Sequence, residues 1–76
     1  MKYQATLELL KLTQADKLAR AIAVMEQTLE KAKRCKTAST MLTTASWGFA
    51  EFSNRIVDAI ETEAVIVNAE ALNNVN

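Results

Sequence analysis

The amino-acid sequence predicts an all-α protein: an antiparallel helical hairpin of two long helices that assembles into a helical bundle. The 76 residues include no proline and one glycine, so the residues that most strongly interrupt helices are almost absent. Half of the residues are hydrophobic, and in both halves of the chain they recur at intervals of three and four, as on one face of a helix. A chain of this length forms one domain, so we expect a single helical domain over residues 1–76.

The first predicted helix covers roughly the first 35 residues, and each residue adds ~1.5 Å to its length. Its central apolar residues follow the 4-3-4-3 spacing of the a and d positions of a coiled coil; they are Leu18, Ile22, Met25, Leu29 and Ala32. We expect this stripe to contact another helix. Gln14 continues the stripe in phase, where a polar residue can fix the register. Thr13 and Asp16 resemble a capping box, so a helix break near Thr13 is the alternative.

A turn is predicted between the helices, at Lys36-Thr37-Ala38-Ser39-Thr40. Short hydroxyl side chains can accept a hydrogen bond from the first backbone N–H groups of a helix, which makes these residues candidate N-caps. The division leaves two segments of similar length, as an antiparallel hairpin requires.

The second predicted helix carries a less regular apolar stripe. The stripe contains Met41, Ala45, Phe49, Phe52, Ile56, then Ala59 or Ile60, then Glu63 or Ala64, and finally Val67 and Ala71. Ser46, Trp47 and Gly48 form a second candidate break, because glycine weakens a helix. The asparagines from Asn73 onward are typical of a helix end that frays.

Charge is distributed unevenly between the two halves. Residues 1–38 carry eight basic and four acidic side chains, a net charge of +4, whereas residues 39–76 carry one basic and five acidic side chains, a net charge of −4. Opposite charges favour packing of one half against the other, within one chain or between chains.

The apolar surface exceeds what a two-helix hairpin hides. Leu9 and Leu12 belong to a second apolar stripe beside the first, and Val65 and Ile66 belong to a segment that is apolar on all faces. A helix that is apolar on several faces requires cover on several faces. We therefore expect a homo-oligomer or a bound partner protein. The partner-binding candidates are Leu9, Leu12, Trp47, Phe49, Phe52, Val65 and Ile66. For the three aromatic residues, packing in the core is the alternative.

Catalytic, cofactor and metal sites are not predicted. The chain has no histidine and one cysteine, Cys35, which rules out an internal disulfide and a zinc site built from these residues. Asp58, Glu61 and Glu63 lie on an ordinary helix without a nucleophile or base nearby, which favours a solvated acidic face. For Glu63, which interrupts the apolar stripe, pairing with a lysine or arginine of the basic half is the alternative.

The basic run Lys31, Lys33, Arg34 and Lys36 offers a phosphate-binding alternative. It lacks interleaved aromatic residues, and cations at a helix C-terminus commonly compensate the helix dipole. No apolar run approaches the ~18 residues of a membrane span, and the N-terminus lacks the apolar core of a signal peptide. The expected location is the cytoplasm, or a host cytoplasm if the source is viral.

The expected function is therefore non-enzymatic: a protein–protein interaction module that acts as an oligomer. Small helical regulators, inhibitors, adaptors and chaperones fit this description. Two alternatives remain open. One is a nucleic-acid-associated regulator that uses the basic run at residues 31–36, and the other is a structural subunit of a helical assembly, because complementary halves can associate head to tail.

Overall fold

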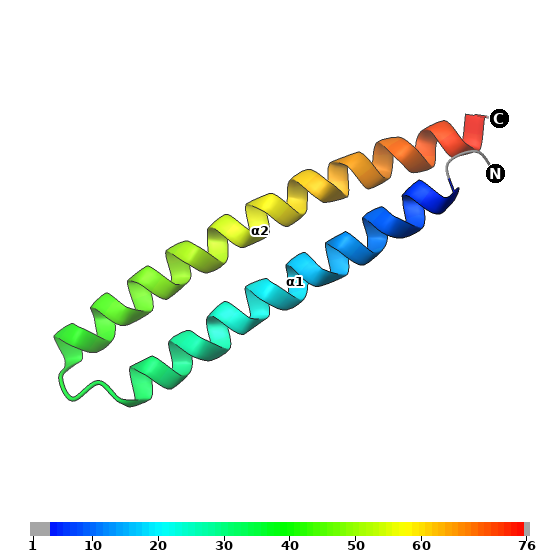
Figure 1. Ribbon diagram of the computed structural model, residues 1–76. Coiled ribbons are helices and arrows are strands. Elements are labelled where there is room, and N and C mark those ends of the chain that lie inside the picture. Colours follow the sequence, from blue (N-terminus) through cyan, green and yellow to red (C-terminus); the bar gives the residue numbers. More distant parts are fainter. Residues whose placement is uncertain (1–3, 76) are drawn as a thin grey trace.

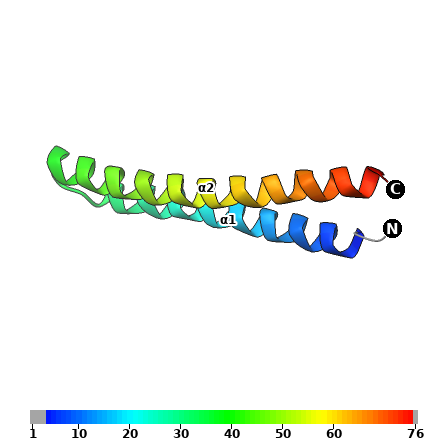
Figure 2. The ribbon, with the colours of Figure 1, turned by 90° about the horizontal axis from the view of Figure 1, so that it is seen from above.

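The computed structural model describes residues 4–75, which form two long antiparallel helices (Figure 1). Helix α1 spans Gln4–Lys33 and helix α2 spans Ala38–Val75. The hairpin is a narrow rod of 59 × 14 × 10 Å, with the chain ends at one end and the connecting turn at the other (Figures 1 and 2). The prediction of an all-α helical hairpin is confirmed. Both helices are continuous, so neither Thr13 nor Gly48 interrupts its helix.

The connection between the helices is short and is capped by a threonine. The hydroxyl oxygen of Thr37 accepts a hydrogen bond from the backbone N–H of Thr40 at 3.2 Å, and the Thr37 carbonyl accepts one from the N–H of Met41 at 3.1 Å. Thr37 is thus the N-cap of α2. The predicted turn at residues 36–40 lies slightly late, because the connection occupies residues 34–37 and α2 already begins at Ala38.

Small and polar side chains fill most of the space between the helices. The buried residues, which we call the interhelical core, are Leu7, Ala21, Val24, Gly48, Ala59, Thr62, Ile66 and Asn73. No large side chain is fully buried among the described residues. The core is consequently thin, and the two backbones lie close together.

The predicted contact stripe of α1 does not face α2. Leu18, Ile22, Met25 and Leu29 are all exposed, and Ile22 keeps 56% of its surface accessible. The residues that face α2 lie one position earlier in the chain: Lys17, Ala21, Val24 and Thr28. Small side chains such as Ala21 let the helices approach, whereas leucine and isoleucine at these positions would hold the axes further apart.

The rod exposes more surface than a compact protein of its mass. Its accessible surface is 5811 Å², whereas a compact monomer of 8.4 kDa exposes about 4,600 Å². The radius of gyration is 17.4 Å, against about 11 Å for a compact domain of this length. The hairpin therefore leaves an excess of roughly 1,200 Å² of surface uncovered by its own chain.

Candidate interaction surface

Seven of the exposed large apolar side chains and the half-buried Ile56 lie on one side of the hairpin. We call this surface the apolar flank, and its residues are Leu18, Ile22, Met25 and Leu29 of α1 and Leu42, Phe49, Ile56 and Ile60 of α2. The four residues of α1 follow a 4-3-4 spacing, so they share one helix face. Met25 and Phe49 line a common groove with Ala45, which places the stripes of the two helices on the same side.

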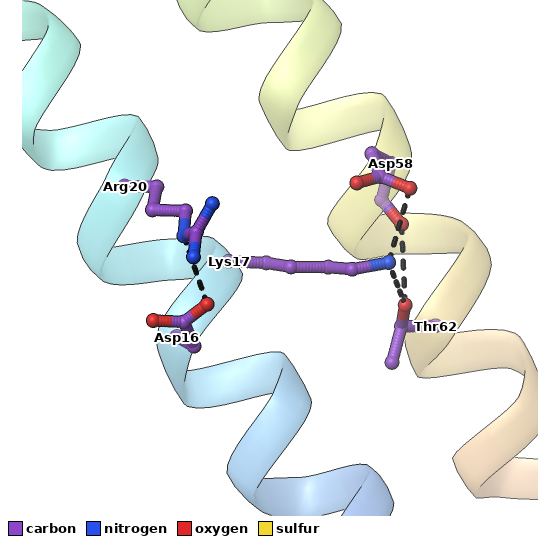
Figure 3. A network of polar contacts seen from close by, with 5 residues as sticks. All are labelled: Asp16, Lys17, Arg20, Asp58 and Thr62. Carbon is purple, nitrogen blue, oxygen red and sulfur yellow. Dashed lines mark hydrogen bonds and ion pairs between the residues drawn. The ribbon is translucent and has the colours of Figure 1, made fainter.

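The opposite side of the hairpin, the polar flank, is built from charged residues of both helices. The Lys17 amino group reaches across from α1 and donates hydrogen bonds to Asp58 Oδ1 at 3.0 Å and to Thr62 Oγ1 at 2.7 Å (Figure 3). Arg20 pairs with Asp16 at 2.9 Å on α1 (Figure 3). A shallow polar groove is lined by the four charged residues of these pairs together with Thr13 and Arg55. The ion pairs and the polar groove thus lie on the side of the rod opposite to the apolar flank.

The cross-helix ion pairs follow the charge asymmetry of the sequence. Lys17 pairs with Asp58 at 3.0 Å, and Lys11 pairs with Glu70 at 3.7 Å. In both pairs the cation comes from the basic first half of the chain and the anion from the acidic second half. Packing of the two halves against each other occurs within the chain, which is one of the two arrangements that the sequence allowed.

The structure does not bring the predicted partner-binding residues together. Leu9 and Leu12 are exposed on the outer face of α1, and Val65 is exposed on α2 away from the apolar flank. Ile66 is only 9% exposed and belongs to the interhelical core, so it is removed from the candidate surface. The reason is geometric, because Ile66 directly follows Val65 and neighbouring helix positions point about 100° apart.

The three aromatic candidates take three different environments around Gly48. Phe49 is exposed on the apolar flank, and Phe52 is half-buried beside it with ring centroids 6.5 Å apart. Trp47 is 77% exposed and lines a different groove, with Gln27, Lys31 and other residues of the polar side. Because Gly48 faces α1, Trp47 and Phe49 project to opposite sides of the hairpin.

The exposed role of the α1 stripe was missed at the sequence level. The 4-3-4-3 spacing marks these residues as an apolar stripe for contact with another helix, but it does not say which helix covers them. A signal for the actual arrangement lies in the neighbouring small residues, since Ala21, Gly48 and Ala59 allow close helix packing.

Four basic side chains cluster at the turn. Lys31, Lys33, Arg34 and Lys36, which we call the basic tip, are all exposed. Lys33 pairs with Glu30 at 3.3 Å, which offsets part of the charge. The other end of the rod, the open end where the chain termini lie, carries mostly acidic side chains: Glu8, Glu61, Glu63 and Glu70.

The remaining chemistry on the described residues is modest. Cys35 is half-buried, with its Sγ 3.4 Å from the Lys31 carbonyl oxygen and 3.5 Å from the Thr44 hydroxyl, which suits a packed thiol. Residues 4–75 contain no group of three potential metal ligands. Neither described helix has a stretch that is apolar and long enough to cross a bilayer.

Comparison with known proteins gives no match: no family model, no curated protein and no solved structure resembles this chain significantly.

Proposed function

We propose that this protein is a non-enzymatic protein–protein interaction module that acts as an oligomer, in the manner of small helical regulators, inhibitors, adaptors and chaperones. The apolar flank carries the proposal. It is a surface of large apolar side chains on one side of both helices, most of them exposed to water, and monomeric proteins rarely expose a large apolar patch. A second hairpin laid against this flank gives a four-helix bundle, in which each apolar stripe faces another.

The uncovered area matches the requirement of such a dimer. A stable interface buries about 800 Å² on each partner, and the excess surface of the hairpin is roughly 1,200 Å². The eight side chains of the apolar flank are aliphatic or aromatic, and such side chains each contribute ~1.5–3 kcal/mol when fully buried. Association therefore supplies the hydrophobic core that the thin interhelical core lacks.

Two leucines provide a matched test. Leu29 lies on the apolar flank and is 57% exposed, whereas Leu72 lies off the flank and is 55% exposed. Both residues occupy the last turns of their helices, so substitution perturbs helix stability similarly. Sedimentation equilibrium at micromolar concentrations should give a dimer for the unmodified protein and for Leu72→Gln. Leu29→Gln should raise the dissociation constant about 100-fold, because two copies of the side chain, each worth ~1.5 kcal/mol, leave the interface.

Equal dissociation constants for the two variants would argue against the apolar flank as the interface. The same measurement addresses the alternative of a structural subunit. A mass that rises without limit as concentration increases indicates an open assembly, whereas a closed dimer gives a plateau at twice the chain mass. No described contact favours nucleic acid, since the basic tip contains an internal ion pair with Glu30 and no aromatic side chain.

A further inference from the structure

We infer that the occupant of the apolar flank is a second copy of this chain packed antiparallel, with the basic tip of each hairpin beside the open end of the other. This inference rests on the proposed self-association and adds the orientation. Two observations support it: the charge difference between the ends of the rod, and the position of the apolar flank along the rod.

The two ends of the hairpin are charged oppositely. At the turn, residues 30–44 contain four basic side chains and one acidic side chain, a net charge of +3. In the segments that lead to the open end, residues 1–12 and 61–76 contain four acidic side chains and two basic side chains, a net charge of −2. A parallel dimer would place like charges together at both ends, whereas an antiparallel dimer pairs +3 with −2 twice. Such complementarity selects the orientation of an interface.

The apolar flank does not run the full length of the rod. On α1 it begins at Leu18, and on α2 its uninterrupted part ends at Ile60, with the exposed Val67 beyond Glu63, so most of it occupies the half of the hairpin that contains the turn. Nearer the open end, the same side of α2 continues with Glu63, at the 3-4 helical spacing from Ile56 and Ile60. When two antiparallel copies overlap their apolar flanks fully, each basic tip extends past the apolar section of its partner and reaches the level of Glu63.

Glu63 has the properties expected of a residue that meets the basic tip of a second copy. It interrupts the apolar stripe of its helix, it is exposed, and within residues 4–75 it makes no ion pair with another side chain. The sequence allows a basic partner for Glu63, and in the antiparallel dimer the basic tip of the second copy supplies it.

Energy transfer between differently labelled copies distinguishes the two orientations. In a Cys35→Ser background, a donor is attached at Ala38→Cys, beside the turn, and the acceptor on other copies is attached at either Ala38→Cys or Ala71→Cys, near the open end. Both positions are exposed, and both substitutions replace alanine. In the antiparallel dimer, roughly 28 residues of helix separate position 38 of one copy from position 38 of the other, which at ~1.5 Å for each residue is a distance of about 40 Å. The same arrangement brings position 38 of one copy close to position 71 of the other.

We expect energy transfer from position 38 to position 71 to exceed energy transfer from position 38 to position 38. Stronger or equal transfer from 38 to 38, in a sample that sediments as a dimer, would overturn the antiparallel orientation while leaving self-association intact. Absence of transfer in both samples, in protein that sediments as a monomer, would overturn the proposed function together with this inference.

Discussion

Gly48 of α2 lies directly against Thr28 of α1, and no space remains between them for another side chain. A Cβ atom built at position 48 would lie 2.7 Å from the Thr28 Cβ and still closer to its hydroxyl group. Carbon atoms in contact are normally about 3.5–4.0 Å apart. The only glycine of the chain therefore sets the distance between the helices near the turn.

Gly48→Ala should destabilise the hairpin. Alanine gains about 1 kcal/mol of helix propensity over glycine, but the clash involves the Thr28 Cβ, which rotation of that side chain cannot move, and overpacking costs ~1–3 kcal/mol. We expect a net loss of about 1 kcal/mol in chemical denaturation at a fixed protein concentration. Thr28→Ala in the same chain removes the hydroxyl and methyl groups and should recover part of the loss. A single variant more stable than the unmodified protein would contradict the close approach.

Lys17 should contribute more to stability than Lys11, although both form cross-helix ion pairs. The Lys17 side chain is 27% exposed and binds both Asp58 and the buried Thr62. Lys17→Ala should cost ~1–2 kcal/mol, because hydrogen bonds to charged groups are lost where water access is reduced. Lys11→Ala serves as the control and should cost less than ~0.5 kcal/mol, since its pair with Glu70 is largely exposed. Thermal unfolding of both variants measures the two losses of stability. A larger loss for Lys11→Ala than for Lys17→Ala would contradict the prediction.

An apolar residue at position 14 should stabilise the fold more than Gln14 does. Its Oε1 atom is buried between the helices without a hydrogen-bond partner among the described residues. An unsatisfied buried acceptor costs ~1–3 kcal/mol, so Gln14→Leu should raise the free energy of unfolding by about 1 kcal/mol. The control is Gln27→Leu, at an exposed position of the same helix, which should change stability little. Destabilisation by Gln14→Leu would show that the amide has a compensating partner in solution.

Trp47 and Phe49 should differ in their effect on self-association, although they are two residues apart and both exposed. Phe49→Ala should raise the dissociation constant of the dimer about 100-fold, because the ring lies on the apolar flank in both copies and each is worth ~1.5 kcal/mol. Trp47→Ala should leave the dissociation constant within a few-fold of the original value, since Trp47 lies on the other side of Gly48. Analytical ultracentrifugation of the two variants measures both values, and the opposite order would refute the assignment of the flank.

The fold class was predictable because its signals are local. The scarcity of proline and glycine and the 3-4 spacing of apolar residues predict helices, and Thr37 caps α2 within the short hydroxyl segment that the sequence identified. The identity of the facing residues was not predictable in the same way. Spacing gives the period of a stripe, but it does not say whether the partner helix belongs to the same chain.

In α1, the residues that face α2 lie one position before the apolar stripe, which illustrates this limit. Leu18 and Ile22 form the more hydrophobic stripe, yet the hairpin packs through Lys17 and Ala21. The close approach of the helices at Gly48 favours small residues on the facing helix. In this hairpin, that close packing outweighs the larger apolar area that leucine would bury. Gly48 was interpreted as a possible break for a related reason, because helix propensity does not include tertiary contacts.

The central claim is that the apolar flank is covered by a second copy of the chain. Isotope-filtered nuclear Overhauser spectroscopy on a mixture of ¹³C-labelled and unlabelled protein observes contacts between copies directly. The account predicts intermolecular contacts for the methyl groups of Ile22, Met25 and Leu29, and none for those of Leu9 and Leu72. Intermolecular contacts confined to Leu9 or Leu72, or their absence in a sample that sediments as a monomer, would contradict it.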